Sequence, residues 1–217
     1  MYNQSRCPCK SQYRVVHTNS FVRGLHASPD APAVDIYVNN NPIARDITYQ
    51  EFTKYFPLAG GLYNIKIYPA GKTTNPIIDQ NVNIPPRSIF TIAATGMLSD
   101  IDLTIIPEPP ISRLPNETFL RVAHLSPKTP NVDITLPNGT KLFGDVEYKE
   151  VTDYIPIRPG TYELQAKLAG TNNIILDVPN TNLRFGNIYT VYIVGLMNGK
   201  PPLQVLIPLD GNTYLQV

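Results

Sequence analysis

The strongest constraint on this chain is an internal duplication. Residues 21–36 read FVRGLHASPDAPAVDI and residues 119–134 read FLRVAHLSPKTPNVDI, so nine of the sixteen positions are identical at an offset of 98 residues. A unit of this length is too long for a solenoid, whose repeats run about 20–45 residues. The pattern therefore indicates a tandem duplication of a complete domain.

The match extends well beyond this motif. The pattern Y-x-E-x-T-x-Y-x-P begins at Tyr49 and again at Tyr148, and Gly61 recurs as Gly160. We therefore divide the 217 residues into an N-terminal arm at 1–19, a first domain at 20–108, a proline-rich linker at 109–117, a second domain at 118–209 and a C-terminal tail or strand at 210–217.

Within each domain, apolar and polar side chains alternate with a period of two. Residues 34–38 (VDIYV) and 63–68 (YNIKIY) show this alternation, which is typical of strands with one face on a core. Residues 89–92 and 189–194 are more continuously apolar, which predicts central strands. Turn-forming pairs such as SP, NG and PG interrupt the chain about every 8–12 residues. The sequence predicts an all-β protein made of two tandem antiparallel β-sandwiches.

Charge and hydropathy exclude several classes of protein. The 18 basic residues nearly balance the 17 acidic ones, and a net charge of +1 is too weak to attract nucleic acid or an anionic membrane. A transmembrane helix needs about 18 apolar residues, but the longest apolar run, 188–197, is interrupted by Thr190 and Gly195. Residues 1–6 have no apolar stretch behind them, so we also expect no secretory signal peptide.

The repeated motif places a histidine, a serine and an aspartate close together in each copy. This repeat signature comprises His26, Ser28, Pro29, Asp35, His124, Ser126, Pro127 and Asp133. A catalytic triad needs a base bonded to the nucleophile and oriented by the acid. Each serine precedes a proline, however, which suits a hydroxyl that caps a turn. We favour a structural role over the catalytic alternative, and we expect the protein not to be an enzyme.

Metal and cofactor sites have little support in the sequence. The histidines His17, His26 and His124 stand far apart, and no pair has the spacing of a zinc site. Asp100 and Asp102 are too few for a calcium loop. No glycine-rich phosphate loop is present. We therefore expect no metal and no cofactor.

Tyrosine is frequent, with 13 residues, while tryptophan is absent. Tyr37, Tyr49, Tyr55 and Tyr68 predict, as one alternative, an exposed surface that binds carbohydrate or a partner protein. Tyrosine is also a common strand residue, which is the favoured interpretation.

The two cysteines, Cys7 and Cys9, are separated by one proline. A disulfide between them would close a strained ring, because bridged Cα atoms usually lie about 5.5–6 Å apart. The arm also supplies too few ligands for a metal. The remaining alternatives are cross-links between molecules and free thiols, and we favour cross-links.

The motif HASPDAPAVDIYVN at 26–39, its second copy HLSPKTPNVDITLPNG at 124–139 and the segment YNIKIYPAG at 63–71 resemble the bacterial domain of unknown function 4397 family. The resemblance covers about residues 20–209. It implies immunoglobulin-like or transthyretin-like sandwiches, usually in cell-envelope or extracellular proteins, and it implies no activity. The chain also resembles the tandem members of spore-forming Firmicutes that lack a signal peptide.

These observations predict a structural protein that assembles with itself on a bacterial cell or spore surface. Sheet edges accept a strand from another chain. The candidate strand-exchange tails contain Tyr13, Val15 and Val16 ahead of the first domain, and Tyr214 and Val217 after the second. Other surface-layer proteins are a second class of partner. The alternative function is an adhesion module that binds through the tyrosines.

Overall fold

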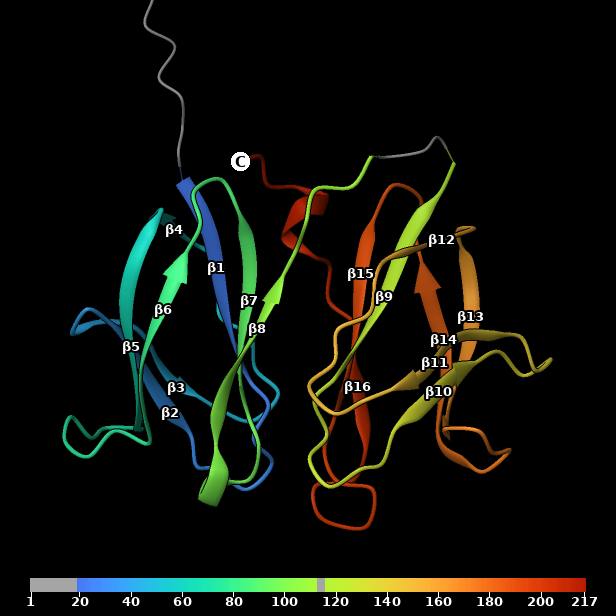
Figure 1. Cartoon of the computed structure of the whole chain (residues 1–217), viewed down its shortest axis with the longest axis horizontal. Helices are drawn as coiled ribbons and strands as arrows, with labels where there is room; N and C mark the ends of the chain where they lie inside the picture. The colour runs from blue at the N-terminus through green and yellow to red at the C-terminus, as the bar shows by residue number, and fades with distance from the viewer. Residues whose placement is uncertain (1–18, 113–115) are drawn as a thin grey trace, which may run out of the picture.

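The computed structural model describes residues 19–112 and 116–217, which form two sandwiches lying side by side (Figure 1). The strands of the first repeat are β1 (Asn19–His26), β2 (Val34–Val38), β3 (Asn41–Ile47), β4 (Phe56–Ala59), β5 (Gly61–Pro69), β6 (Ile78–Ile84), β7 (Ile89–Thr95) and β8 (Asp102–Pro107). A 3₁₀ turn, η1 (Leu98–Asp100), precedes β8. No helix in the described part of the chain is long and apolar enough to cross a membrane.

The second repeat has the same number and order of strands. They are β9 (Thr118–His124), β10 (Val132–Thr135), β11 (Lys141–Val146), β12 (Ile155–Ile157), β13 (Gly160–Leu168), β14 (Ile174–Leu183), β15 (Ile188–Val194) and β16 (Gln204–Leu206). A second 3₁₀ turn, η2 (Gly211–Thr213), follows and lies between the two sandwiches near the C-terminus (Figure 1).

Each sandwich consists of an inner sheet that faces the other repeat and an outer sheet that faces away (Figure 1). The inner sheets have the orders β4-β1-β7-β8 and β12-β9-β15-β16, and the outer sheets have the orders β3-β2-β5-β6 and β11-β10-β13-β14. Every strand of the second repeat occupies the place of its counterpart in the first. The prediction of an all-β chain with two tandem β-sandwiches is confirmed.

One strand pair in each inner sheet is parallel. Strand β1 pairs with β7 in the register Phe21↔Ile89, and β9 pairs with β15 in the register Phe119↔Ile188. The other pairs of named strands are antiparallel, as expected. Alternation of side chains does not distinguish the two directions, because successive residues point to opposite faces in both.

Each sandwich has its own apolar core between its two sheets. The core of the first repeat contains Val22, Val34, Ile65, Ile67, Ile78, Val82, Ile84, Phe90, Ile92 and Ala94. The core of the second repeat contains Leu120, Val122, Val132, Ile134, Phe143, Val146, Leu164, Ala166, Leu183, Tyr189, Val191, Ile193 and Leu203.

A third apolar cluster joins the two repeats, and we call it the inter-repeat core. It contains Leu25, Ala27, Ala93, Ile106, Ala123, Leu125, Tyr192 and Val194, all buried. Its members come from the inner sheets of both repeats. The two sandwiches are therefore packed against each other rather than connected by the linker alone.

The inter-repeat core explains why β7 and β15 are apolar along their whole length. All seven residues of each strand are buried. In β15, Tyr189, Val191 and Ile193 face their own sandwich, whereas Tyr192 and Val194 face the other repeat. Both faces of these strands are thus covered. Neither strand has a face in contact with solvent, so apolar and polar residues do not alternate along it.

We expect Leu125→Ala to lower the free energy of unfolding by about 2–5 kcal/mol, because it leaves a cavity in the fully buried inter-repeat core. Urea unfolding monitored by circular dichroism measures this change. The matched control is Leu62→Ala, since Leu62 is 67% exposed and its loss should change stability by less than about 0.5 kcal/mol. Equal effects of the two variants would contradict a packed inter-repeat core.

Candidate functional site

The histidine and serine of the repeat signature hold the turns that follow β1 and β9. His26 Nε2 lies 2.9 Å from the carbonyl oxygen of Pro32, and the Ser28 hydroxyl donates to the carbonyl oxygen of Gly96 at 2.7 Å. A carbonyl can only accept, so Nε2 carries the proton. These bonds tie the turn after β1 to the end of β7.

The second repeat reproduces this arrangement. His124 Nε2 lies 3.3 Å from the carbonyl oxygen of Pro130, and the Ser126 hydroxyl donates to the carbonyl oxygen of Gly195 at 2.6 Å. Among the described residues, no hydrogen bond joins a signature serine hydroxyl to the imidazole of its own repeat. The geometry is that of two turn caps.

The aspartates of the signature hold other loops. Asp35 accepts hydrogen bonds from the backbone N–H groups of Asp46 at 2.9 Å and Gly71 at 3.0 Å. Asp133 accepts the corresponding bonds from Asp145 at 2.8 Å and Gly170 at 3.1 Å. Each carboxylate thus connects two loops, and neither orients the histidine of a triad.

The repeated segment that begins at Tyr49 also has a structural role. The Tyr49 ring packs edge-on against His26 with centroids 6.2 Å apart. The Glu51 carboxylate accepts from the Thr48 backbone N–H at 2.7 Å. The Thr53 hydroxyl accepts from the Gly24 backbone N–H at 2.8 Å. Tyr148, Glu150 and Thr152 make the corresponding contacts in the second repeat.

The largest concentration of buried charge lies between the repeats, and we call it the inter-repeat charge cluster: Arg23, Arg121, Glu108 and Asp210. Each of the four residues is at most 4% exposed. Arg23 Nε donates to the Thr91 hydroxyl at 2.8 Å, and Nη1 donates to the carbonyl oxygen of Leu209 at 2.9 Å. Nη2 lies 3.4 Å from Asp210 and 3.7 Å from Glu108.

Arg121 repeats this pattern in the opposite direction. Its Nε donates to the Thr190 hydroxyl at 2.8 Å, and Nη1 donates to the carbonyl oxygen of Pro107 at 2.7 Å. Its Nη2 lies 3.8 Å from Asp210. Arg23 therefore reaches the C-terminal end of the second repeat, and Arg121 reaches the C-terminal end of the first. The two contacts are equivalent under exchange of the repeats.

Two half-buried tyrosines complete the cluster. The Tyr55 hydroxyl donates to Glu108 at 2.7 Å, and the Tyr154 hydroxyl donates to Asp210. The Gly211 backbone N–H also donates to Glu108, at 2.6 Å. Burial raises the pKa of both tyrosines above the usual value, so their hydroxyls stay protonated and continue to donate.

The same tyrosines lie against the arginine planes. The Arg23 guanidinium is 4.7 Å from the ring centroids of both Tyr55 and Phe52, and the Arg121 guanidinium is 4.3 Å from that of Tyr154. Such stacking is favourable for a desolvated cation.

The inter-repeat charge cluster combines two cations with two anions in a site closed to water. A complete buried ion cluster adds little net stability, but loss of one member leaves an unpaired buried charge. Arg23 belongs to the first repeat and its partner Asp210 follows the second, so this pair forms only when the two repeats are packed together. The cluster therefore favours the observed packing of the sandwiches.

The sequence interpretation did not identify these residues, although a signal was present. Arg23 and Arg121 are identical at equivalent strand positions, in segments whose other residues are mostly apolar. Thr91 and Thr190 are also repeated, as are the cluster tyrosines. A charged residue kept in a buried strand position of both copies indicates a buried polar partner.

The exposed tyrosine surface, the alternative to the favoured interpretation, is not present. Tyr68 is buried, and Tyr37, Tyr49 and Tyr55 are half-buried, so none of the four is exposed. Tyr37 packs edge-on against Tyr68 with centroids 5.3 Å apart. Contacts with neighbouring rings and with the inter-repeat charge cluster cover these side chains.

The N-terminal candidates Cys7, Cys9, Tyr13, Val15 and Val16 lie outside the described residues.

The C-terminal candidates pack on their own chain. After η2, residues 214–217 form no strand. Asp210 and Gly211 are held in the inter-repeat charge cluster, and the Tyr214 ring packs edge-on against Tyr55 at 6.2 Å. Tyr214 and Val217 themselves are exposed. Residues 210–217 were expected to form either a tail or a strand, and they contain η2 but no strand.

Within residues 19–112 and 116–217, no three histidine, cysteine, aspartate or glutamate side chains gather as metal ligands.

We expect the stability contributed by Asp210 to depend on pH between about 4 and 6. Burial raises the pKa of this carboxyl to about 6, above its usual 3.8, with the nearby Glu108 charge adding to the effect. Because the pKa is higher in the folded protein than in the unfolded chain, the contribution of Asp210 to the free energy of unfolding is full below pH 3.8. It is lost as pH rises through about 6.

The measurement is urea unfolding of the wild type and Asp210→Asn from pH 4 to pH 7.5. The wild type should gain about 2–3 kcal/mol relative to the variant on acidification. Contributions of the histidines cancel in this difference, because both proteins contain them. A difference that does not vary with pH would show that Asp210 does not titrate there.

We expect both signature histidines to titrate below the usual pKa of 6.5. Burial lowers the pKa of His26 and of His124, although their carbonyl partners oppose the effect. Both rings are therefore neutral at pH 7, and the stability that they contribute is lost as pH falls below 6.5. NMR titration of the imidazole signals, with the urea-unfolded protein as reference, checks this. A folded pKa equal to or above the unfolded value is the contrary result.

Comparison with known proteins places the chain in a family without assigning an activity. The family model described as Domain of unknown function (DUF4397) matches residues 20–135 and 118–213. Among curated proteins, none matches the chain in sequence.

Three solved structures are similar at low identity. The Bacillus anthracis TIE protein is 12% identical to this chain, with a TM-score of 0.27. The match covers 82% of this chain and 34% of the TIE chain. The family CBM26 module from Eubacterium rectale Amy13K, solved with maltoheptaose, is 8% identical with a TM-score of 0.28, covering 89% of this chain and 99% of that one. A leucine-rich repeat protein from Bacteroides thetaiotaomicron is 11% identical with a TM-score of 0.22, covering 83% and 26%.

These TM-scores are too low to support any functional argument. The narrower resemblance, to tandem members of spore-forming Firmicutes, stays a prediction. The family match, in contrast, includes both repeats and the signature residues of each. The chain therefore belongs to the family described as a domain of unknown function, DUF4397, and contains two copies of that domain.

Proposed function

We propose that this protein is a non-enzymatic structural protein of a bacterial surface that assembles with copies of itself. Subunits join by strand addition at a sheet edge, and N-terminal disulfides then lock the assembly. The observation that carries the proposal is a weakly protected edge strand, β6, in the outer sheet of the first repeat.

The absence of an enzymatic role in this proposal is supported by the use of the reactive side chains. His26 and Ser28 bond to backbone carbonyls, and Asp35 bonds to backbone N–H groups. Their counterparts in the second repeat do the same. The same residue types hold the equivalent loops in both repeats, and this structural role accounts for their presence in both copies.

The inter-repeat charge cluster and the inter-repeat core support a building block of fixed shape. A subunit with a rigid geometry adds to an assembly without the entropy cost of ordering two loosely tethered domains. Burying the inner sheets between the repeats also leaves the outer sheets and their edges as the surfaces offered to partners.

Strand β6 differs from its counterpart β14 in how well its edge is protected. The seven residues of β6 (IDQNVNI) contain no proline and one charged side chain, Asp79, and its register with β5 is uninterrupted. In contrast, β14 contains Pro179, has Asn180 at φ 57° and shows two register shifts against β13. Natural edge strands use prolines, charges and bulges to prevent pairing, so β6 is the less protected of these two edges.

The donor in this proposal is the N-terminal arm, with Tyr13, Val15 and Val16 forming the added strand. Cys7 and Cys9 then lie next to the neighbouring subunit, where oxidation outside the reducing cytoplasm cross-links them. Contact with a neighbour through different surfaces on the two subunits extends into a fibre when the rotation does not close.

The proposed location is a bacterial cell or spore surface, on the basis of the family resemblance. Other surface-layer proteins are a second class of partner, and neither nucleic acid nor membrane is included. The adhesion alternative has less support, because its four tyrosines are not exposed.

We expect deletion of residues 1–19 to abolish assembly, and the double variant Cys7→Ser, Cys9→Ser to assemble but to dissociate in denaturant. Negative-stain microscopy and sedimentation of oxidised protein measure the two effects. Substitution Asn83→Lys in β6 should raise the concentration needed for assembly several-fold, because a charge at an edge opposes strand addition.

The matched control is Asn182→Lys in β14. Asn83 pairs with Leu62 and Asn182 pairs with Thr161, which places the two exposed asparagines at equivalent positions of the two repeats. Asn182→Lys should leave assembly unchanged. If the truncated protein assembles like the full chain, or if both lysine variants behave alike, the strand-addition model is wrong.

A further inference from the structure

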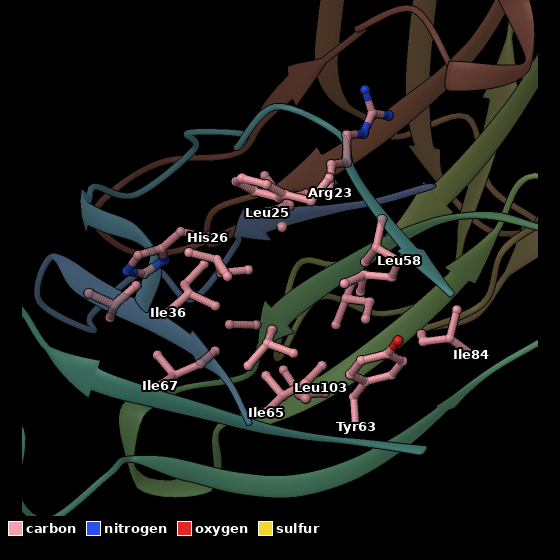
Figure 2. Close-up of a pocket in the computed structure, with 18 residues that line it drawn as sticks. Arg23, Leu25, His26, Ile36, Leu58, Tyr63, Ile65, Ile67, Ile84 and Leu103 are labelled. Atoms are coloured by element: carbon pink, nitrogen blue, oxygen red, sulfur yellow. The ribbon is translucent and has the colours of Figure 1, made fainter. Parts of the chain in front are cut away.

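The first sandwich encloses an apolar cavity of about 50 Å³ between its inner and outer sheets (Figure 2). Its lining includes Val22, Ile36, Ile43, Phe56, Leu58 and Ile65. A cavity needs only about 10–15 Å³ to hold one water molecule, so this one has room for several atoms. An apolar site of this kind does not retain water, since water needs two or more polar partners.

Most polar groups of the lining residues are engaged elsewhere. The guanidinium of Arg23 points away from the cavity and bonds in the inter-repeat charge cluster (Figure 2). His26 Nε2 bonds to the carbonyl oxygen of Pro32, and the Tyr63 hydroxyl donates to the carbonyl oxygen of Ala59 at 2.8 Å. His26 Nδ1 is buried without a hydrogen-bond partner. The residues that line the cavity are otherwise almost all apolar.

The first repeat has smaller side chains than the second at two positions near the cavity. Gly24 in β1 corresponds to Val122 in β9, which is fully buried in the core of the second repeat. Ile36 pairs with Ala44, whereas the corresponding Ile134 pairs with Phe143. Val122 and Phe143 both belong to the apolar core of the second sandwich.

Other differences recover only part of this volume. Phe56 stands where the second repeat has Ile155, since these residues pair with Val22 and Leu120 at equivalent positions. Phe56 lines the cavity without closing it.

The backbone does not require a glycine at position 24. Gly24 lies inside a strand and is not among the glycines with positive φ. A Cβ there would lie 3.1 Å from Ile36 Cδ1 and 3.3 Å from Thr53 Cγ2, a tight fit that the second repeat accommodates with Val122 and Thr152. Glycine in a strand interior lowers stability and often marks the close approach of a ligand.

The lining residues differ in burial from strand to strand. Ile65, Ile67 and Ile92, from the middle strands, are buried. Ile43 in β3, Leu58 in β4 and Leu103 in β8 are half-buried. These three strands are edges of the two sheets. The lining is thus less covered toward the edges of the sandwich than at its middle.

We propose that this cavity binds the end of an unbranched aliphatic chain, which enters from an edge of the sandwich and leaves its polar end outside the apolar lining. The volume of about 50 Å³ limits the ligand to a short hydrocarbon segment, and the apolar lining excludes a polar group at depth. The site lies inside the sandwich, where Ile84 of β6 contributes to the lining, whereas the proposed assembly uses the outer edge of β6.

The test uses the full chain and a series of straight-chain primary alcohols from butanol to decanol. Methyl NMR of isoleucine, leucine and valine follows binding. We expect saturable shifts at Ile36, Ile65 and Ile92. Affinity should rise about four-fold for each added methylene and then level off when the chain exceeds the cavity.

The second repeat provides an internal control in the same molecule. Methyl groups of Ile134, Leu164 and Val191 occupy the equivalent positions in the core of the second repeat, which has the larger Val122 and Phe143, and we expect them not to shift. Equal shifts in both repeats, an affinity that rises without levelling off, or no saturable shift in the first repeat would each overturn the proposal.

Substitution Gly24→Val introduces the residue of the second repeat and should reduce the affinity at least ten-fold. Gly24→Ala is a milder variant with a smaller expected loss. A folded Gly24→Val protein that binds the alcohols like the wild type would also overturn the proposal. If neither variant folds, the comparison of the two repeats in the wild type decides the question.

Discussion

The pairing of Arg23 and Arg121 with Glu108 and Asp210 is the constraint on which the arrangement of the two repeats depends. A charge removed from water must be paired, because the cost of burying it alone exceeds what packing returns. Each arginine reaches a carbonyl oxygen at the end of the other repeat, so neither can be satisfied within its own sandwich. The surrounding apolar residues of the inter-repeat core supply burial, and the charges favour the observed placement of the two surfaces.

Duplication has preserved the fold while allowing the two interiors to differ. Protein cores are packed to nearly crystalline density, so different side chains at equivalent core positions change the packing of the two copies. Gly24 and Val122 occupy the same strand position and make the same backbone bond to a threonine hydroxyl, at 2.8 and 3.0 Å. The backbone bond at this point is therefore the same with glycine and with valine, although a Cβ at position 24 would be in tight contact with Ile36 and Thr53.

The inter-repeat contact also determines which surfaces remain available. Once the inner sheets face each other, their central strands are covered on both sides, and the edge strands of the sheets remain accessible. The two outer edges that correspond to each other, β6 and β14, are protected to different extents. Assembly through β6 would depend on a difference in edge protection between the two repeats. Binding inside the first sandwich would depend on a difference in their core side chains. The structural signature residues are the same in both copies because both must fold.

Local patterns in the sequence were sufficient for the repeat, the strands and the sandwich class, because alternation and turn residues report on the nearest few positions. The turn-capping roles of Ser28 and Ser126 could also be inferred, since a serine before a proline is a local signal. The inter-repeat charge cluster was not predictable in this way: Arg23 and Leu209 are 186 residues apart, and no periodicity relates them. The burial of Tyr55 and the opening beside Gly24 likewise depend on which side chains meet across sheets. The sequence by itself determined what each repeat is, and only the tertiary structure decided how the repeats join and where space remains between their sheets, because long-range contacts are set by packing.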